Sequence, residues 1–132
     1  MRAILIAMAL VAGLAPASRA LAGATVASVT QADLPSGKDM ALTAVTVTYA
    51  PGQSSMPHHH GGFVMAYVLK GTIVTQVEGE PEKTLGPGQS WTEAPGAHHI
   101  VCRNPSRTEP AEFLAVIVAP KGAEVSTADG AR

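Results

Sequence analysis

The chain has 132 residues, of which 46% are hydrophobic and 14% are charged. This length forms one domain, and the apolar fraction is sufficient for a buried core. The formal net charge of −1, with basic residues scattered along the chain, excludes the concentrated positive charge that binds nucleic acid or an anionic membrane surface. Cys102 is the only cysteine, so an intramolecular disulfide is excluded as well.

The first 22 residues are typical of a secretory signal peptide. Met1-Arg2 gives a positive start, residues 3–15 form an apolar run without charge, and small residues near Ala20 and Ala22 offer cleavage sites. The run is short for a membrane anchor, which needs about 20 apolar residues. Cleavage after Ala22 leaves seven basic and ten acidic residues, a formal charge of −3. We therefore expect a periplasmic or secreted protein that is not held in a membrane after cleavage.

The rest of the chain consists of short apolar runs separated by Gly and Pro, and no long stretch shows the apolar period of a helix. Residues 43–49 alternate, with Val45, Val47 and Tyr49 on one face and Ala44, Thr46 and Thr48 on the other, which predicts a half-buried strand. Residues 63–69 are almost continuously apolar, which predicts a strand buried on both faces. Further strands are expected at 72–77, 83–85, 90–93, 98–103 and 113–118.

The regular spacing of these short strands favours an all-β sandwich or barrel. Most of the 13 glycines and 10 prolines lie at the turns between the strands. We therefore expect residues 23–120 to form one small β-barrel or jelly roll. Residues 121–132 are small and polar, and we expect them to form a loose tail.

All five histidines lie in two clusters, His58-His59-His60 and His98-His99. Imidazole is the commonest biological metal ligand. Residues two apart in a strand share a face, so His58 and His60 can both face the barrel interior, where unpaired polar groups are costly. An imidazole from the second cluster would complete a three-point metal seat with vacant positions for water or substrate. Position parity leaves the choice between His98 and His99 open, and an exposed polar loop is the alternative for the triple histidine.

The two clusters lie in segments that resemble the paired motifs of the cupin superfamily, in its small single-domain form. The first motif is carried by Pro51-Gly52, His58-His59-His60, Tyr67-Val68-Leu69-Lys70-Gly71 and Gly79, and the second by Gly88, Pro95, Gly96, His99 and Asn104. The motifs span residues 51–79 and 88–104, and the likeness covers Val45 to Val118. The resemblance implies a double-stranded β-helix, or jelly-roll, barrel.

The resemblance also implies that His58, His60 and His99 are metal ligands, because His99 lies three residues after Gly96, where the family has its histidine. The family's glutamate ligand falls at about Val64, whose side chain cannot bind a metal. Three imidazoles without a carboxylate form a neutral site, which favours one divalent ion of Fe, Ni, Cu or Zn over the harder Mn.

The function implied by the resemblance is binding of a divalent metal and a small organic molecule by an exported protein. Cupin enzymes include dioxygenases, isomerases and lyases, and the fold does not choose among them. The alternative is a periplasmic protein that binds a metal or small molecule without catalysis, and the absent glutamate favours this second function. A metal-free structural cupin is a third possibility. The resemblance also implies pairing into a homodimer through edge strands.

Four other residues carry more limited expectations. Glu93 could orient a histidine of the second cluster, but a solvated carboxylate at a strand edge is expected instead. Tyr67 is expected to be a core residue with its hydroxyl at the rim, and Trp91 to be a packing residue. Cys102 lies three residues after His99, so strand alternation predicts that these two side chains face opposite ways.

Overall fold

Eleven β-strands form the described part of the protein, which comprises residues 19–21, 23–35 and 39–130 of a computed structural model. Most of the predicted signal peptide, residues 1–18 and 22, lies outside this part. Arg19–Leu21 form β1, which pairs with β2, and cleavage at Ala22 would remove this strand. In the described residues no helix is long and apolar enough to cross a membrane.

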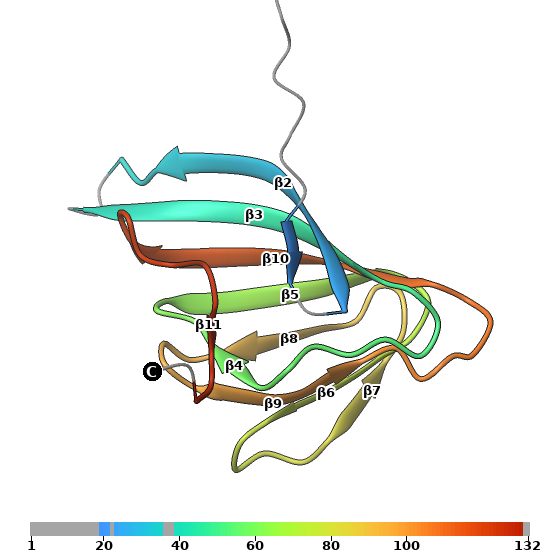
Figure 1. The fold of residues 1–132 in the computed structure, drawn as a ribbon. Helices are drawn as coiled ribbons and strands as arrows, with labels where there is room; N and C mark the ends of the chain where they lie inside the picture. The colour runs from blue at the N-terminus through green and yellow to red at the C-terminus, as the bar shows by residue number, and fades with distance from the viewer. Residues whose placement is uncertain (1–18, 22, 36–38, 131–132) are drawn as a thin grey trace, which may run out of the picture.

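The strands form two antiparallel sheets that lie one above the other (Figure 1). The order of the first sheet is β1 (Arg19–Leu21), β2 (Ala24–Asp33), β3 (Met40–Tyr49), β10 (Ala111–Pro120), β5 (Phe63–Lys70) and β8 (Ser90–Glu93). The order of the second sheet is β11 (Thr127–Ala128), β4 (His58–His59), β9 (His98–Arg103), β6 (Ile73–Val77) and β7 (Lys83–Leu85). All seven strands predicted from the sequence are present, so the all-β prediction is confirmed.

The core lies between the two sheets and follows strand alternation. Inward positions two residues apart on β5 and β10 are almost fully buried, and so are the facing residues of β3 and β6. The aromatic side chains Phe113 and Trp91 pack with ring centroids 5.0 Å apart. The larger core includes Val45, Tyr49, Val64, Ala66, Val68, Ile73, Trp91, Phe113, Ala115 and Ile117.

The prediction that β5 is buried on both faces is wrong. Phe63, Tyr67 and Leu69 are each more than 40% exposed, because none of the described segments covers the outer face of the first sheet at β5. Tyr67 is therefore a surface residue and not a core residue. The homodimer implied by the resemblance stays a prediction.

A β-bulge in β9 changes which of its side chains face inward. Val77 pairs with His99 and Gln76 pairs with Val101, so Ile100 is an extra residue in this ladder. A bulge shifts the alternation of a strand by one position. Consequently His99 and Cys102 are both 3% exposed and line the same interior, and the prediction that they face opposite ways is wrong.

Residues 121–130 also differ from the expectation of a loose tail. In Figure 1 this segment crosses from the first sheet to the second, where β11 pairs with β4. The backbone N–H of Asp129 donates to the carbonyl oxygen of Pro57 at 2.9 Å. Without β11, β4 would be an edge strand paired only with β9, and residues 127–129 supply backbone partners on its other side.

Gly62 allows the chain between β4 and β5 to pass close to the backbone of β10. A Cβ atom at Gly62 would lie 2.1 Å from the carbonyl oxygen of Val118 and 2.6 Å from the Cβ of Ala119. Only a residue without a side chain fits between the histidine segment and β10. Gly62 therefore fixes the path of the chain directly after His60.

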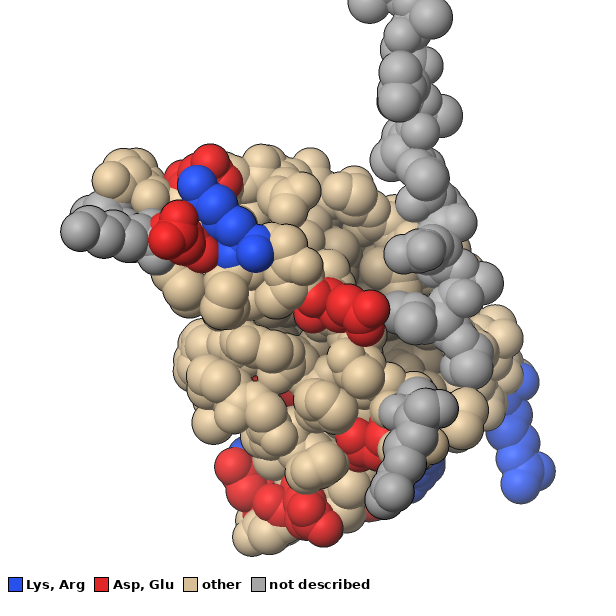
Figure 2. Space-filling model, turned by 60° about the vertical axis from the view of Figure 1, so that its left-hand side comes forward, with Lys and Arg blue, Asp and Glu red and all other residues tan. Residues whose placement is uncertain are grey.

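Charged side chains are distributed over the surface in small groups. On the face shown in Figure 2, acidic side chains lie in separate groups, and the described basic side chains lie partly between acidic ones and partly at the edge of the face. The described residues visible there form no continuous basic patch. This face therefore offers no broad positive surface.

Candidate metal centre

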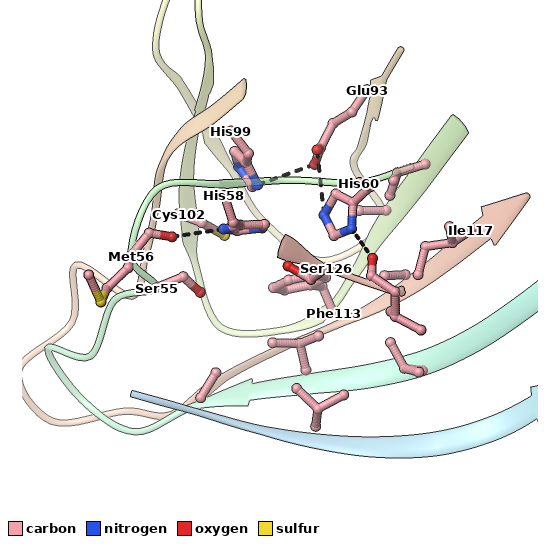
Figure 3. Close-up of a pocket in the computed structure, with 18 of the residues that line it drawn as sticks. Ser55, Met56, His58, His60, Glu93, His99, Cys102, Phe113, Ile117 and Ser126 are labelled. Atoms are coloured by element: carbon pink, nitrogen blue, oxygen red, sulfur yellow. Dashed lines mark hydrogen bonds and ion pairs between the residues drawn. The ribbon is translucent and has the colours of Figure 1, made fainter. Parts of the chain in front are cut away.

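A cavity of about 140 Å³ lies between the two sheets. Most of its wall is apolar and comes from inward positions of β3, β5 and β10. Four ionisable side chains, His58, His60, His99 and Glu93, gather at one side of it (Figure 3). Pockets for drug-sized ligands measure roughly 300–1,000 Å³, so this cavity suits a smaller molecule.

Strand register brings the three histidines together. His58 on β4 lies directly opposite His99 on β9, and their ring centroids are 5.0 Å apart. His60 follows β4, and its ring is also 5.0 Å from that of His58. One ligand atom from each of the three residues lies within 4.8 Å of the others, so the structure brings together the residues that the sequence nominates.

Each of these imidazoles is oriented through one ring nitrogen. Nδ1 of His58 donates to the carbonyl oxygen of Met56 at 2.8 Å, and Nδ1 of His60 donates to the carbonyl oxygen of Val125. Nε2 of His99 shares a hydrogen bond with the hydroxyl of Thr75 at 2.7 Å. Hydrogen bonds of this kind set the tautomer of a metal-binding imidazole and leave its other nitrogen available.

Burial keeps the three imidazoles uncharged. Removal from solvent lowers the pKa of His58 and of His60, and it lowers the pKa of His99 to about 3. A neutral imidazole is the form that binds a metal. The histidines are therefore ready as ligands across the physiological pH range.

Glu93 contributes a carboxylate to the same cluster. The residue is 3% exposed, so the prediction of a solvated edge carboxylate is wrong. Its Oε1 accepts a hydrogen bond from the indole N–H of Trp91 at 2.9 Å and lies 3.2 Å from Nδ1 of His99. Its Oε2 lies 3.7 Å from Nε2 of His60 and has no hydrogen-bond partner, the one such buried side-chain atom among the described residues. Burial raises the pKa of the Glu93 carboxyl.

Glu93 places a carboxylate beside Val64, the position where the sequence lacks one. Val64 on β5 pairs directly with Glu93 on β8, so the carboxylate enters from the neighbouring strand. Strand alternation in Ser90–Glu93 could have revealed this, because a buried Trp91 places Glu93 on the same inward face. The two sequence motifs do not show which strand pairs with β5, so they do not reveal that Glu93 lies beside Val64.

These donors fit a divalent cation. Three neutral nitrogens converge, and the Glu93 carboxylate lies beside them, with its unpartnered Oε2 3.7 Å from Nε2 of His60. Buried polar atoms are nearly always satisfied, and a cation would satisfy this one. The cluster could therefore bind a metal, with a carboxylate that the sequence motifs do not supply.

Two further groups in the cavity wall stay protonated. Burial raises the pKa of the Cys102 thiol to about 12, and it raises the pKa of the Tyr49 hydroxyl, which is hydrogen-bonded to the hydroxyl of Ser55. A thiol with so high a pKa is a poor nucleophile and a poor metal ligand. Cys102 therefore serves as a small buried side chain in the wall.

The fold is similar to those of several solved structures. An RmlC-like cupin from Shewanella frigidimarina NCIMB 400 matches with a TM-score of 0.62 and 17% identity, over 81% of this chain and 86% of that chain. The DMSP lyase DddQ from Ruegeria pomeroyi DSS-3 matches with a TM-score of 0.58 and 22% identity, over 67% of this chain and 43% of that chain. A predicted oxalate decarboxylase from Thermotoga maritima matches with a TM-score of 0.59 and 25% identity, over 73% of this chain and 80% of that chain.

The comparison of sequences gives the family. A search of curated proteins finds no match. The family model described as the Cupin domain matches residues 45–117, more than half of the chain. Together with the structural likenesses this confirms the cupin-type jelly-roll barrel that the two motifs imply. The chain therefore belongs to the cupin family.

Proposed function

We propose that the cavity binds one divalent metal ion through His58, His60 and His99, with Glu93 as a fourth, anionic ligand. The observation that carries this proposal is the buried, unpartnered Oε2 of Glu93 beside three imidazoles that are each anchored through the other ring nitrogen. The added negative charge would strengthen binding of a dication relative to three neutral histidines alone. Fe, Ni, Cu and Zn remain the favoured ions because imidazole dominates the ligand set.

We further propose that the protein acts on a small organic carboxylate. A metal in this position would supply a Lewis acid. Neutral histidines and one carboxylate around a dication leave a net positive charge, which attracts an anion of a size that fits about 140 Å³. The apolar walls of the cavity exclude water and hold the non-polar part of the ligand. The 25% identity to a predicted oxalate decarboxylase supports a carboxylate substrate.

Binding without catalysis is the second candidate. Glu93 is the only carboxylate that lines the cavity among the described residues, and once it binds a metal no separate general base remains there. An enzyme would be supported if any member of a panel of small carboxylates led to release of CO₂, to formation of an elimination product or to consumption of O₂. Stoichiometric metal and saturable carboxylate binding without turnover would support the binding protein.

The metal proposal is tested by metal analysis of protein purified without a histidine tag. We expect one equivalent of divalent metal in a His98→Gln background, chosen so that the imidazoles on the outer surface do not contribute. Adding His99→Ala removes one of the converging ligands and should lower the retained metal about tenfold or more. Glu112→Gln, a substitution on β10 away from the histidines, should retain the full equivalent. Full metal retention in the His99→Ala protein would contradict the proposal.

We also propose that the protein is exported after removal of the first 22 residues, as the apolar run after Arg2 predicts. The expected mature protein begins at about Gly23 and is found in the periplasmic or secreted fraction. Intact mass and N-terminal sequencing of protein from fractionated cells test this directly. Recovery of the full-length chain from the membrane fraction would show that the segment is an anchor.

A further inference from the structure

The register that places one histidine pair in the cavity places a second pair on the outer surface. His59 on β4 lies directly opposite His98 on β9, and their ring centroids are 5.6 Å apart. The side chains are 35% and 50% exposed, so both rings are accessible from solvent. Neither residue lines the cavity, and the site proposed above uses neither of them.

A carboxylate from the C-terminal segment lies between these two rings. Oδ1 of Asp129 is 2.8 Å from Nδ1 of His59, and Oδ2 is 2.9 Å from Nδ1 of His98. The backbone fixes this position, because β11 pairs with β4 and the N–H of Asp129 donates to Pro57. The carboxylate is therefore held at the histidines by the sheet and not only by its own side-chain contacts.

We propose that His59, His98 and Asp129 form a second divalent metal site, open to solvent and suited to Zn²⁺ or Cu²⁺. One ligand atom from each residue lies within 4.8 Å of the others, so small side-chain rotations would bring all three to the bond lengths of about 2.0–2.2 Å that Zn²⁺ requires. Two imidazoles and one carboxylate are a common ligand set for Zn²⁺, with solvent filling the remaining position. Binding requires each ring to carry its proton on Nε2 in place of Nδ1.

This outer site would also stabilise the wall of the cavity. Val125, Ser126 and Ala128 of the same segment line the cavity, and Val125 orients His60 through its carbonyl oxygen. An ion bound to Asp129 would tie this segment to β4 and β9. A metal ion in the outer site would therefore favour the position of this segment in which the carbonyl oxygen of Val125 orients His60.

The first test isolates the outer site. In a His58→Ala/His99→Ala background, which lacks two of the inner histidines, calorimetric titration with Zn²⁺ is expected to show one equivalent bound. Adding Asp129→Asn should weaken this binding about tenfold or more, because an amide replaces the anionic ligand. Glu124→Gln removes another acid from the same segment and should leave the affinity within about twofold of the parent. Because two of the inner histidines are absent and Asp129 lies outside the cavity, the effect of Asp129→Asn does not depend on the proposed function.

A second measurement covers the case in which the background variant does not fold. Asp129→Asn and His98→Gln in the otherwise unchanged chain should each remove one weakly held Zn²⁺ equivalent, while metal at the inner site is retained. The proposal would be overturned if the wild-type chain bound no Zn²⁺ in addition to the metal at the inner site. It would also be overturned if Asp129→Asn left the binding of the second Zn²⁺ unchanged. The three side chains would then form only a hydrogen-bonded contact that holds the C-terminal segment.

Discussion

Glu93→Gln is expected to weaken binding of a divalent metal in the cavity about tenfold or more, while leaving the metal-free protein as stable as the wild type or more stable. Glutamine keeps the shape and can still accept the hydrogen bond from Trp91. It removes a buried charge whose Oε2 has no partner without a metal, and its amide N–H can donate to Nε2 of His60. Glu93→Gln is therefore expected to lower the stability of the metal-bound protein and to maintain or raise that of the metal-free protein.

Thermal unfolding measures both forms of the Glu93→Gln protein. With excess chelator, its melting temperature should equal or exceed that of the wild type. With excess metal, the metal-induced rise in melting temperature should be smaller than in the wild type, because stabilisation follows metal affinity. Thr92→Ala, an exposed neighbour on β8, is the matched control and should change neither value. An unchanged metal affinity in Glu93→Gln would mean that the carboxylate is not a ligand.

The second large effect is a loss of stability in acid. For the metal-free protein, we expect the free energy of unfolding to fall as the pH decreases from 6.5 to about 3, because His99 has a folded-state pKa of about 3 against 6.5 in the unfolded chain. The unfolded state binds the proton first, so the stability is present above 6.5 and is lost as the pH falls. This residue alone accounts for roughly 4 kcal/mol by pH 3, a large share of the ~5–15 kcal/mol typical of a domain.

His58 and His60 act in the same direction, since burial lowers the pKa of each. Glu93 acts in the opposite direction, because its raised pKa favours the folded state in acid and makes the net loss smaller. Denaturant unfolding at a series of pH values measures the sum. A bound metal would hold the imidazoles deprotonated and move the loss to lower pH.

A neighbouring pair of variants isolates the contribution of His99. His99→Gln should flatten the decline between pH 6.5 and 3, although it removes packing at all pH values. His98→Gln should not flatten it, because the hydrogen bond to Asp129 raises the pKa of His98, and that contribution is present in acid and lost as the pH rises. An equally steep decline in His99→Gln and in the wild type would contradict the assignment.

The barrel could be predicted from the sequence because local signals dominate it. Gly and Pro mark the turns, and the residues between them are apolar and β-branched, which was enough to locate seven strands. The histidine trio could also be nominated, since alternation places His58 and His60 on one face. The choice of His99 over His98 came from the family likeness, and the register of β4 against β9 agrees with that choice.

The remaining features depend on contacts that the local sequence does not encode. The bulge at Ile100 is set by how β9 pairs with β6, and it places Cys102 inside. The exposure of Tyr67 depends on whether another layer covers β5. The role of Glu93 depends on its pairing with Val64, a residue 29 positions earlier in the chain. The attachment of residues 127–129 to β4 likewise joins segments about 70 residues apart.

That last attachment has a consequence for biosynthesis. The segment that pairs with β4 is translated after all the other strands, yet it supplies the carbonyl of Val125 to His60 and the carboxylate of Asp129 to His59 and His98. On a nascent chain that ends at β10, the outer cluster lacks Asp129, and His60 lacks the carbonyl oxygen of Val125 that orients it. If these sites bind metal as proposed, they reach their final form only after translation, so in an exported protein the compartment of final folding would determine which ion is taken up.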